Sequence, residues 1–285
     1  MVLRFFGDLG VNRDTIALCG YVSELEWWAE FNRRWEEVLR EAGLKPKPGY
    51  FHMTDFNARR GVYRDWTQEK RVQVFDRLLE IITTTILAGA IPVGFGIAIG
   101  VVRADYDSLN EDDRWRLGRS LFALCASVLM GQVTRRLRDV GISEAVGYVF
   151  ERGDEYSREL VREINAMHAR SPRIRELILS IELADKRVFS GLQAADILAF
   201  ETSRYVPVDL GFDDREPRHV IRNLVGQRPT RYIKRWFDQA ALRALLAKKE
   251  TREMRDQAEE LFGLPLSRRV PGQRNVEDSG TEPYL

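Results

Sequence analysis

The amino-acid sequence predicts an α/β domain in which a mixed β-sheet is flanked by helices. Two β-rich runs at residues 2–6 and 15–22 open the chain, and the polar turn 7–14 between them is typical of a hairpin. Beyond this hairpin, segments with helical spacing alternate with strand-like segments as far as residue 205. This order is typical of one sheet with helices packed against it.

The first helix and the third strand have clear local signals. Ser23 begins a Ser-Glu-Leu-Glu capping box, and apolar residues with helical spacing continue to Ala42, just before Gly43. After a helix at about 67–88, residues 93–101 alternate large apolar side chains with glycine and alanine. That alternation predicts a strand with one face of small residues, and we expect a closely docked helix to cover this face.

The second half of the chain continues the alternation. The predicted elements are a helix at 111–139, a strand at 145–151, a helix ending near His168, a strand at 177–183, a helix beginning at Ser190 and a C-terminal helix at about 237–262. We therefore expect an α/β domain at 1–206, a basic segment with the C-terminal helix packed on it at 207–263, and a disordered tail at 264–285.

Composition excludes several classes of protein. The chain has 285 residues, of which 44% are apolar and 31% charged, and its net charge of +1 is ordinary for a globular protein. Cys19 and Cys125 lie far apart without a Cys/His cluster, which excludes a disulfide scaffold and a recognisable zinc module. The chain begins as a strand rather than a signal peptide, and its longest apolar run, 86–102, contains Pro92. We expect a cytoplasmic protein without a membrane span.

Asp196 is the first candidate site residue. It lies in the helix that begins at Ser190, where Leu192, Ile197, Leu198 and their neighbours leave no polar face in the first two turns. Such a helix belongs in the interior of the protein. An ionised carboxylate there is costly unless it is paired or bound to a metal. Asp196 therefore belongs either to a buried polar pair or to a functional site.

Two further carboxylates lie where sites form in α/β sheets. Glu151 ends a predicted strand, and Asp8 lies in the first hairpin. Because sites gather at strand ends in open α/β sheets, Asp8, Glu151 and Asp196 could converge. Carboxylates with a histidine nearby, His52, and without cysteine favour Mg²⁺ or Mn²⁺ over zinc. Two such ions can align water with a phosphodiester and stabilise the leaving oxygen.

Three motifs resemble those of a known family. Phe51-His-Met-Thr-Asp-Phe56, Phe150-Glu-Arg-Gly-Asp154 and Gly191-Leu-Gln-Ala-Ala-Asp-Ile-Leu-Ala199 occur in that order, and Gly20 to Trp35 adds an aromatic pattern. Together they resemble the bacterial domain-of-unknown-function family 3800, over residues 5–205. The resemblance implies a ribonuclease-H-like fold with a mixed sheet flanked by helices. It also implies a metal-dependent carboxylate site of the nuclease type.

The chain departs from the family at the first strand. Members typically have Asp-Glu/Asp-Ser/Thr-Gly there, with the leading Asp as the expected first metal ligand. This chain has Gly7-Asp8-Leu9-Gly10. Aligned on the last glycine, Gly7 replaces the leading Asp and the site has lost a ligand. Shifted by one residue, Asp8 serves as the leading Asp in a shortened turn.

Several candidates have structural alternatives. Gln193 can close a capping box with Ser190, Asp154 can cap the following helix, and Asp55 can cap a short helix. Glu151 can pair with an arginine at the strand end. Lys186 can meet a phosphate, although a solvated turn lysine is the commoner case. His52 is either a hydrogen-bonded core histidine or part of the site.

A basic stretch follows the domain. Arg215 to Arg235 contains seven Lys and Arg residues against one acid, Glu216, with His219, Tyr232 and Trp236 interleaved. Such a stretch could bind a phosphate backbone and stack bases. The alternative is a solvated helix face balanced by acids elsewhere.

Two main functions fit these patterns, and hydrolysis of a smaller phosphate ester, which only substrate screening would separate, is a third. The first is a phosphodiesterase that acts on nucleic acid with Mg²⁺ or Mn²⁺, in which Asp8, Glu151 and Asp196 hold the metal and His52 assists proton transfer or orientation. The second is a non-catalytic nucleic-acid-binding or protein-interaction module with a degraded site. A cheap discriminator is whether oxygens of the three carboxylates lie within about 4–6 Å of a common point.

Overall fold

The computed structural model of this chain describes residues 1–44, 49–87, 94–118, 120–152, 155–170, 176–222, 224 and 231–249. Its six strands are β1 (Leu3–Val11), β2 (Thr15–Glu24), β3 (Phe95–Val102), β4 (Val146–Glu151), β5 (Ile178–Ala184) and β6 (Tyr232–Phe237). They form one sheet in the order β5-β4-β1-β2-β3-β6. β2 is antiparallel to β1 and β3, whereas β4, β5 and β6 each run parallel to a neighbour. The predicted α/β class with a mixed sheet is confirmed.

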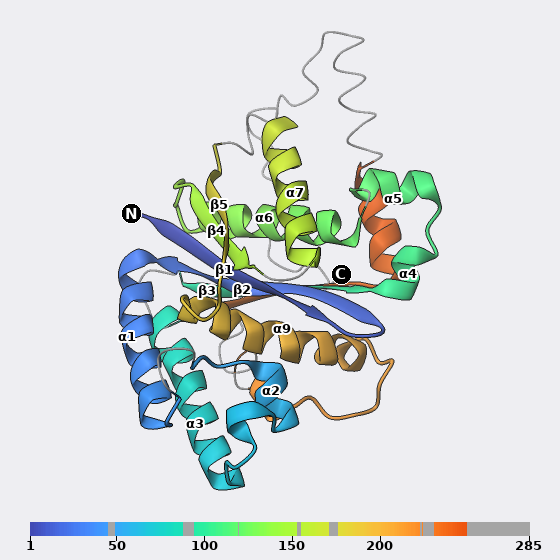
Figure 1. The fold of residues 1–285 in the computed structure, drawn as a ribbon. Helices are drawn as coiled ribbons and strands as arrows, with labels where there is room; N and C mark the ends of the chain where they lie inside the picture. Colours follow the sequence, from blue (N-terminus) through green and yellow to red (C-terminus); the bar gives the residue numbers. More distant parts are fainter. Residues whose placement is uncertain are drawn as a thin grey trace, which may run out of the picture.

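Helices cover both faces of this sheet (Figure 1). One face carries α1 (Leu25–Glu41), α2 (Met53–Ala58), α3 (Gln68–Ile81) and α9 (Ser190–Asp209), and the other carries α6 (Leu121–Asp139) and α7 (Glu155–Arg170). The short helical segments are η1 (Gly61–Tyr63), η2 (Ile82–Ile86), α4 (Arg103–Asp107), α5 (Glu111–Leu117) and α10 (His219–Ile221).

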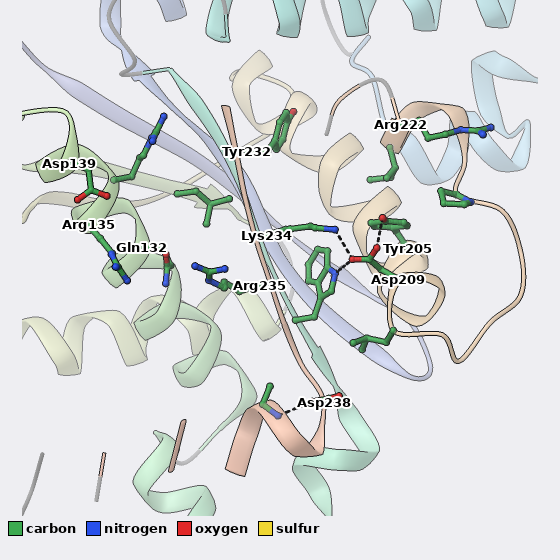
Figure 2. Close-up of a pocket in the computed structure, with 17 residues that line it drawn as sticks. Gln132, Arg135, Asp139, Tyr205, Asp209, Arg222, Tyr232, Lys234, Arg235 and Asp238 are labelled. Atoms are coloured by element: carbon green, nitrogen blue, oxygen red, sulfur yellow. Dashed lines mark hydrogen bonds and ion pairs between the residues drawn. The ribbon is translucent and has the colours of Figure 1, made fainter. Parts of the chain in front are cut away.

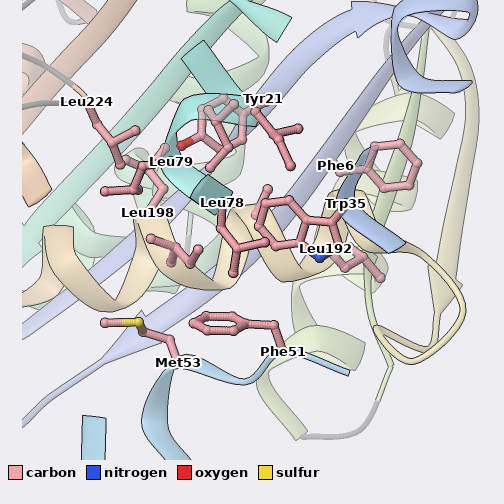
Figure 3. Packing of buried hydrophobic residues seen from close by; sticks show 14 of the residues in the cluster. Phe6, Tyr21, Trp35, Phe51, Met53, Leu78, Leu79, Leu192, Leu198 and Leu224 are labelled. Atoms are coloured by element: carbon pink, nitrogen blue, oxygen red, sulfur yellow. The ribbon is translucent and has the colours of Figure 1, made fainter. Parts of the chain in front are cut away.

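Each face of the sheet has its own hydrophobic core. On the α9 side, Trp35 and Phe51 are fully buried with residues of β1, β2 and α9 (Figure 3). On the α6 side, Phe5, Tyr148 and Phe150 pack in one aromatic group, with ring centroids 5.4–6.4 Å apart. The two cores hold the sheet rigidly between the helix layers.

Helix α9 lies unusually close to the sheet because glycines face it. A Cβ atom at Gly10 would lie 2.1 Å from the carbonyl oxygen of Ala199, and one at Gly100 would lie 2.6 Å from Val206. The expected docking of a helix on the small face of β3 is therefore confirmed at Gly100. At Gly96 the space is filled by Tyr232 of β6 instead.

The start of the chain differs from the sequence expectation in two respects. β1 continues through Val11, so the turn is confined to residues 12–14 and Asp8 lies in a strand, not in a hairpin loop. β2 continues through Glu24, which caps α1 without a side-chain hydrogen bond, so the predicted capping box at Ser23 is wrong. In both places strand pairing between β1 and β2 extends farther than the local turn signals indicate.

The predicted helix at 111–139 is two helices. α5 ends at Leu117, followed by Gly118 as its C-cap with a φ of +125°, a backbone conformation that favours glycine, and α6 starts at Leu121. By length and composition alone this segment could cross a membrane, but the apolar side chains of α6, among them Leu124 and Leu129, pack in the core of the domain.

The segment after residue 206 contributes to the sheet itself. Residue 206 lies inside α9, and β6 pairs with β3 where the sequence indicates only a basic stretch. The C-terminal helix is present at 239–249, starting after Phe237, which belongs to β6. The part of its predicted range after residue 249 lies outside the described residues, as does the predicted tail at 264–285.

Candidate functional site

Three carboxylates converge on the ammonium group of Lys186. Its Nζ atom lies 2.6 Å from Glu151 Oε2, 3.7 Å from Asp8 Oδ2 and 3.7 Å from Asp196 Oδ1. Oxygens of all three predicted metal ligands thus lie within 4 Å of a common point, and that point is a lysine nitrogen. We call these four residues the Lys186 cluster.

The topology explains why these residues meet. Asp8 in β1 and Glu151 at the end of β4 lie on adjacent parallel strands, with Gly7 opposite Phe150. Both point to the face of the sheet that α9 covers, since Phe6 and Val149, two residues earlier, belong to that core. Lys186 lies in the short connection from β5 to α9, and Asp196 follows in the second turn of α9.

Burial makes the electrostatics of this cluster strong. Lys186 is 6% exposed and Asp8 and Asp196 are 7% exposed each, so the predicted solvated turn lysine is wrong. Burial disfavours the charged ammonium, but attraction to Asp8, Asp196 and Glu151 outweighs it and raises the pKa of Lys186. Burial raises the pKa of Asp8, with the other two carboxylates adding to the rise and Lys186 opposing it. One ammonium does not neutralise three carboxylates, of which Asp8 and Asp196 are buried and Glu151 is partly exposed.

The second oxygen of Asp196 fixes the backbone of the His52 segment. Asp196 Oδ2 accepts a hydrogen bond of 2.7 Å from Met53 N. Asp196 is therefore part of a buried polar network, and its role in a functional site stays a prediction. The loop that carries His52 is tied to the same carboxylate that faces Lys186.

Gln193 completes this connection. Its Oε1 accepts hydrogen bonds from Trp35 Nε1 and Phe51 N, both 2.9 Å, and its Nε2 donates to the Lys186 carbonyl oxygen at 2.8 Å. The predicted capping box with Ser190 is wrong, because Phe189 is the N-cap and makes no side-chain bond. Gln193 instead joins α1, the His52 segment and the backbone of Lys186 inside the core.

The structure places the remaining candidates at the margin of the cluster. His52 Nδ1 is 2.9 Å from Asp55 Oδ2, and the His52 side chain is 29% exposed. Within the described residues, the His52 side chain is hydrogen-bonded to Asp55, and no such bond joins it to the Lys186 cluster. Asp55 lies in the first turn of α2, whose N-cap His52 makes no side-chain capping bond. Asp154 lies outside the described residues.

The basic stretch is largely neutralised by acids from other segments. Ion pairs join Arg215 to Asp213, Arg218 to Glu201, Arg222 to Glu216 and Lys234 to Asp209. Arg228 lies outside the described residues. The stretch itself contains one acid, Glu216, and the other three partners lie outside it, so the sequence of the stretch does not reveal them.

The carboxylate oxygens of the cluster are suitable ligands for Mg²⁺ or Mn²⁺, but in this structure they surround the ammonium group of Lys186. Carboxylate oxygens are the ligands that these hard cations prefer. In the part of the chain that the structure describes, no three His, Cys, Asp or Glu side chains are grouped closely enough to hold a metal ion. Lys186 Nζ occupies the space between the oxygens, so a metal needs the ammonium to shift.

Sequence reasoning missed the central position of Lys186 and the connecting role of Gln193. One signal was available for Lys186. It lies in the short connection between the strand β5 and the helix α9, which carries Asp196. No family model and no curated protein matches this chain.

Proposed function

We propose that this protein is a ribonuclease-H-like, divalent-metal-dependent phosphodiesterase that acts on nucleic acid. The observation that carries the proposal is the convergence of Asp8, Glu151 and Asp196 within 3.7 Å of one atom, from three separate elements. The sheet, with the antiparallel β1-β2-β3 unit extended by parallel β4 and β5, agrees with the fold that the motifs imply. In this proposal Asp8 would serve as the first ligand in spite of the altered turn sequence.

The three carboxylates would hold the metal, which when bound would activate water and stabilise the leaving oxygen of a phosphodiester. Formal charges support one divalent ion. With all three carboxylates ionised, as metal ligands must be, they carry three negative charges against one positive charge on Lys186, so a single divalent cation would make the cluster neutral.

The second candidate is a non-catalytic binding or interaction module. It is favoured by one observation: the Lys186 ammonium already lies 2.6 Å from Glu151 and between the other two carboxylates. A buried cluster in which opposite charges offset one another can persist as a structural element without a metal. In that case the lysine closes the site permanently.

A cleavage assay separates these functions. Single-stranded, duplex and hybrid substrates would be incubated at high enzyme concentration with Mg²⁺ or Mn²⁺, and with EDTA. We expect metal-dependent cleavage by the wild type, and its loss in Asp196→Asn, whose side-chain oxygen can still accept from Met53 N. Asp185→Asn is the matched control, because Asp185 pairs with exposed Arg187 outside the cluster. If no substrate is cut under any condition, the phosphodiesterase proposal is wrong.

A further inference from the structure

A second candidate site lies along the edge strand β6, away from the Lys186 cluster. A cavity of about 940 Å³ is lined by the end of α6, the end of α9 with the segment that follows it, and β6 (Figure 2). Helix α9 links the two sites, since the 13 residues from Asp196 to Asp209 span about 20 Å. No residue of the Lys186 cluster lines this cavity.

Asp209 holds an aromatic surface in place on one side of β6. It accepts hydrogen bonds from Trp236 Nε1 at 2.6 Å, from the Tyr205 hydroxyl at 2.5 Å and from Lys234 Nζ at 2.8 Å. The rings of Tyr205 and Trp236 are 6.3 Å apart at 80°. Both side chains are partly exposed. A fixed, partly exposed indole is a surface on which a nucleobase can stack.

Uncompensated positive charge lies on the other side of the strand. Arg235 points away from Lys234 and Trp236 toward α6, where Arg135 and Gln132 also face the cavity (Figure 2). Neither Arg135 nor Arg235 forms an ion pair with a described residue. Over the whole lining, five Lys and Arg side chains face three aspartates. Guanidinium groups free of carboxylate partners are suited to bidentate contact with phosphate.

We propose that this cavity binds a short segment of single-stranded nucleic acid, with phosphates on Arg135 and Arg235 and a base on Trp236. The volume is at the upper end of the range of about 300–1,000 Å³ for ligand pockets, so it accommodates more than a phosphate ion. The assignment deepens the proposed function, because it names the substrate class and a surface that holds the strand apart from the carboxylates. In this proposal the nucleic acid contacts a small set of residues from α6 and β6, and not the whole basic stretch from Arg215 to Arg235.

The test measures binding without cleavage. Fluorescence anisotropy of a labelled 20-nucleotide single strand would be recorded in EDTA, at several salt concentrations, for the wild type and for Arg135→Gln/Arg235→Gln. The control is Arg33→Gln/Arg40→Gln, which removes the same charge from exposed positions on α1. Thermal melting checks that each variant is folded. If the double variant does not fold, Arg135→Gln alone takes its place, because Arg135 is exposed on α6.

We expect Kd to rise about tenfold or more in the cavity variant and to change little in the control. The slope of log K against log salt should fall by about 1.4, or about 0.7 for each lost phosphate contact. Equal effects in both double variants, or none, would overturn the proposal, as would equally effective competition by polyglutamate.

Cleavage is measured separately, so that the two proposals can fail independently. Binding that depends on this cavity without any cleavage refutes only the phosphodiesterase, and cleavage without the cavity effect refutes only the cavity.

Discussion

At the scale of single residues, Lys186 supplies the counter-charge of the carboxylate cluster. Its ammonium is the only positive group that the described ion pairs place among Asp8, Glu151 and Asp196. Without it, three carboxylates would share one largely buried space with no counter-charge. Removing one partner of a buried ion pair costs about 3–5 kcal/mol, because the remaining charge is left uncompensated.

Replacing Lys186 with methionine tests this role. We expect Lys186→Met to lower the free energy of unfolding by about 3 kcal/mol in metal-free buffer, measured by urea denaturation. Arg187→Met is the control, because Arg187 is exposed and its change should stay within about 0.5 kcal/mol. A Lys186→Met protein as stable as the wild type would show that the ammonium does not hold the cluster together.

The residue types of the cluster could be predicted from the sequence, but their contacts could not. Asp196 was identifiable because an acid interrupts an otherwise apolar helix, and Glu151 because it ends a strand. Gln193 was misassigned because a local capping pattern is visible in sequence, whereas its partners Trp35 and Phe51 are more than 140 residues away. Lys186 looked like a turn residue because nothing local reveals the burial that the flanking β5 and α9 impose.

At the scale of elements, the fit of α9 to the sheet sets the position of Asp196. Gly10 allows Ala199, three residues after Asp196, to touch β1. A side chain at Gly10 would force α9 away from the strand that carries Asp8. The docking of this helix and the geometry of the cluster are therefore coupled.

A Gly10→Ala variant tests the coupling. Its Cβ would lie 2.1 Å from the Ala199 carbonyl oxygen, so we expect a loss of about 2 kcal/mol or more in the free energy of unfolding. Gly131→Ala is the matched control, because Gly131 lies in α6 with open space around it. There alanine should stabilise by about 0.5–1 kcal/mol. Equal melting temperatures for the two variants would contradict close docking.

Glu201, farther along α9, gives a prediction on pH. It is 1% exposed, and burial raises its pKa although Arg218, 3.1 Å away, and Arg204 lower it. An acid whose folded pKa is raised adds stability below its ordinary pKa of 4.5 and loses it as pH rises through the folded value. We expect Glu201→Gln to match the wild type near pH 4 and to become relatively more stable toward pH 8.

Urea denaturation across this pH range measures the effect. Glu216→Gln is the control, since it makes the same chemical change at a side chain that is 85% exposed. A stability difference between wild type and Glu201→Gln that is constant with pH, or that falls as pH rises, would contradict a raised pKa at this position.

At the scale of the whole molecule, the sequence predicts the class of fold but not the edge strand β6 of the sheet. The alternation of strands and helices predicts the segments of β1 to β5 and the presence of helices packed against the sheet, but not the strand order or which helices cover which face. β6 was missed because Tyr232–Phe237 carries Lys234 and Arg235 within a charged stretch, and an edge strand can hold such residues without burying their charges. Its place beside β3 depends on pairing across more than 130 residues, which no local pattern reports.

The same long-range pairing brings the two candidate sites onto one scaffold. The Lys186 cluster lies where β1, β4 and α9 meet, and the β6 cavity lies at the far end of α9. In the proposed enzyme, the first would carry the metal and the second would hold the strand. The central claim is that the cluster binds a divalent cation in spite of Lys186.

Calorimetric titration with Mn²⁺ tests that claim most directly. The account predicts one Mn²⁺ per chain for the wild type, unchanged binding for Asp185→Asn, and no measurable binding for Asp196→Asn. Absence of Mn²⁺ binding to the wild type, or equal binding to Asp196→Asn, would contradict it and leave the cluster as a buried ion network closed by Lys186.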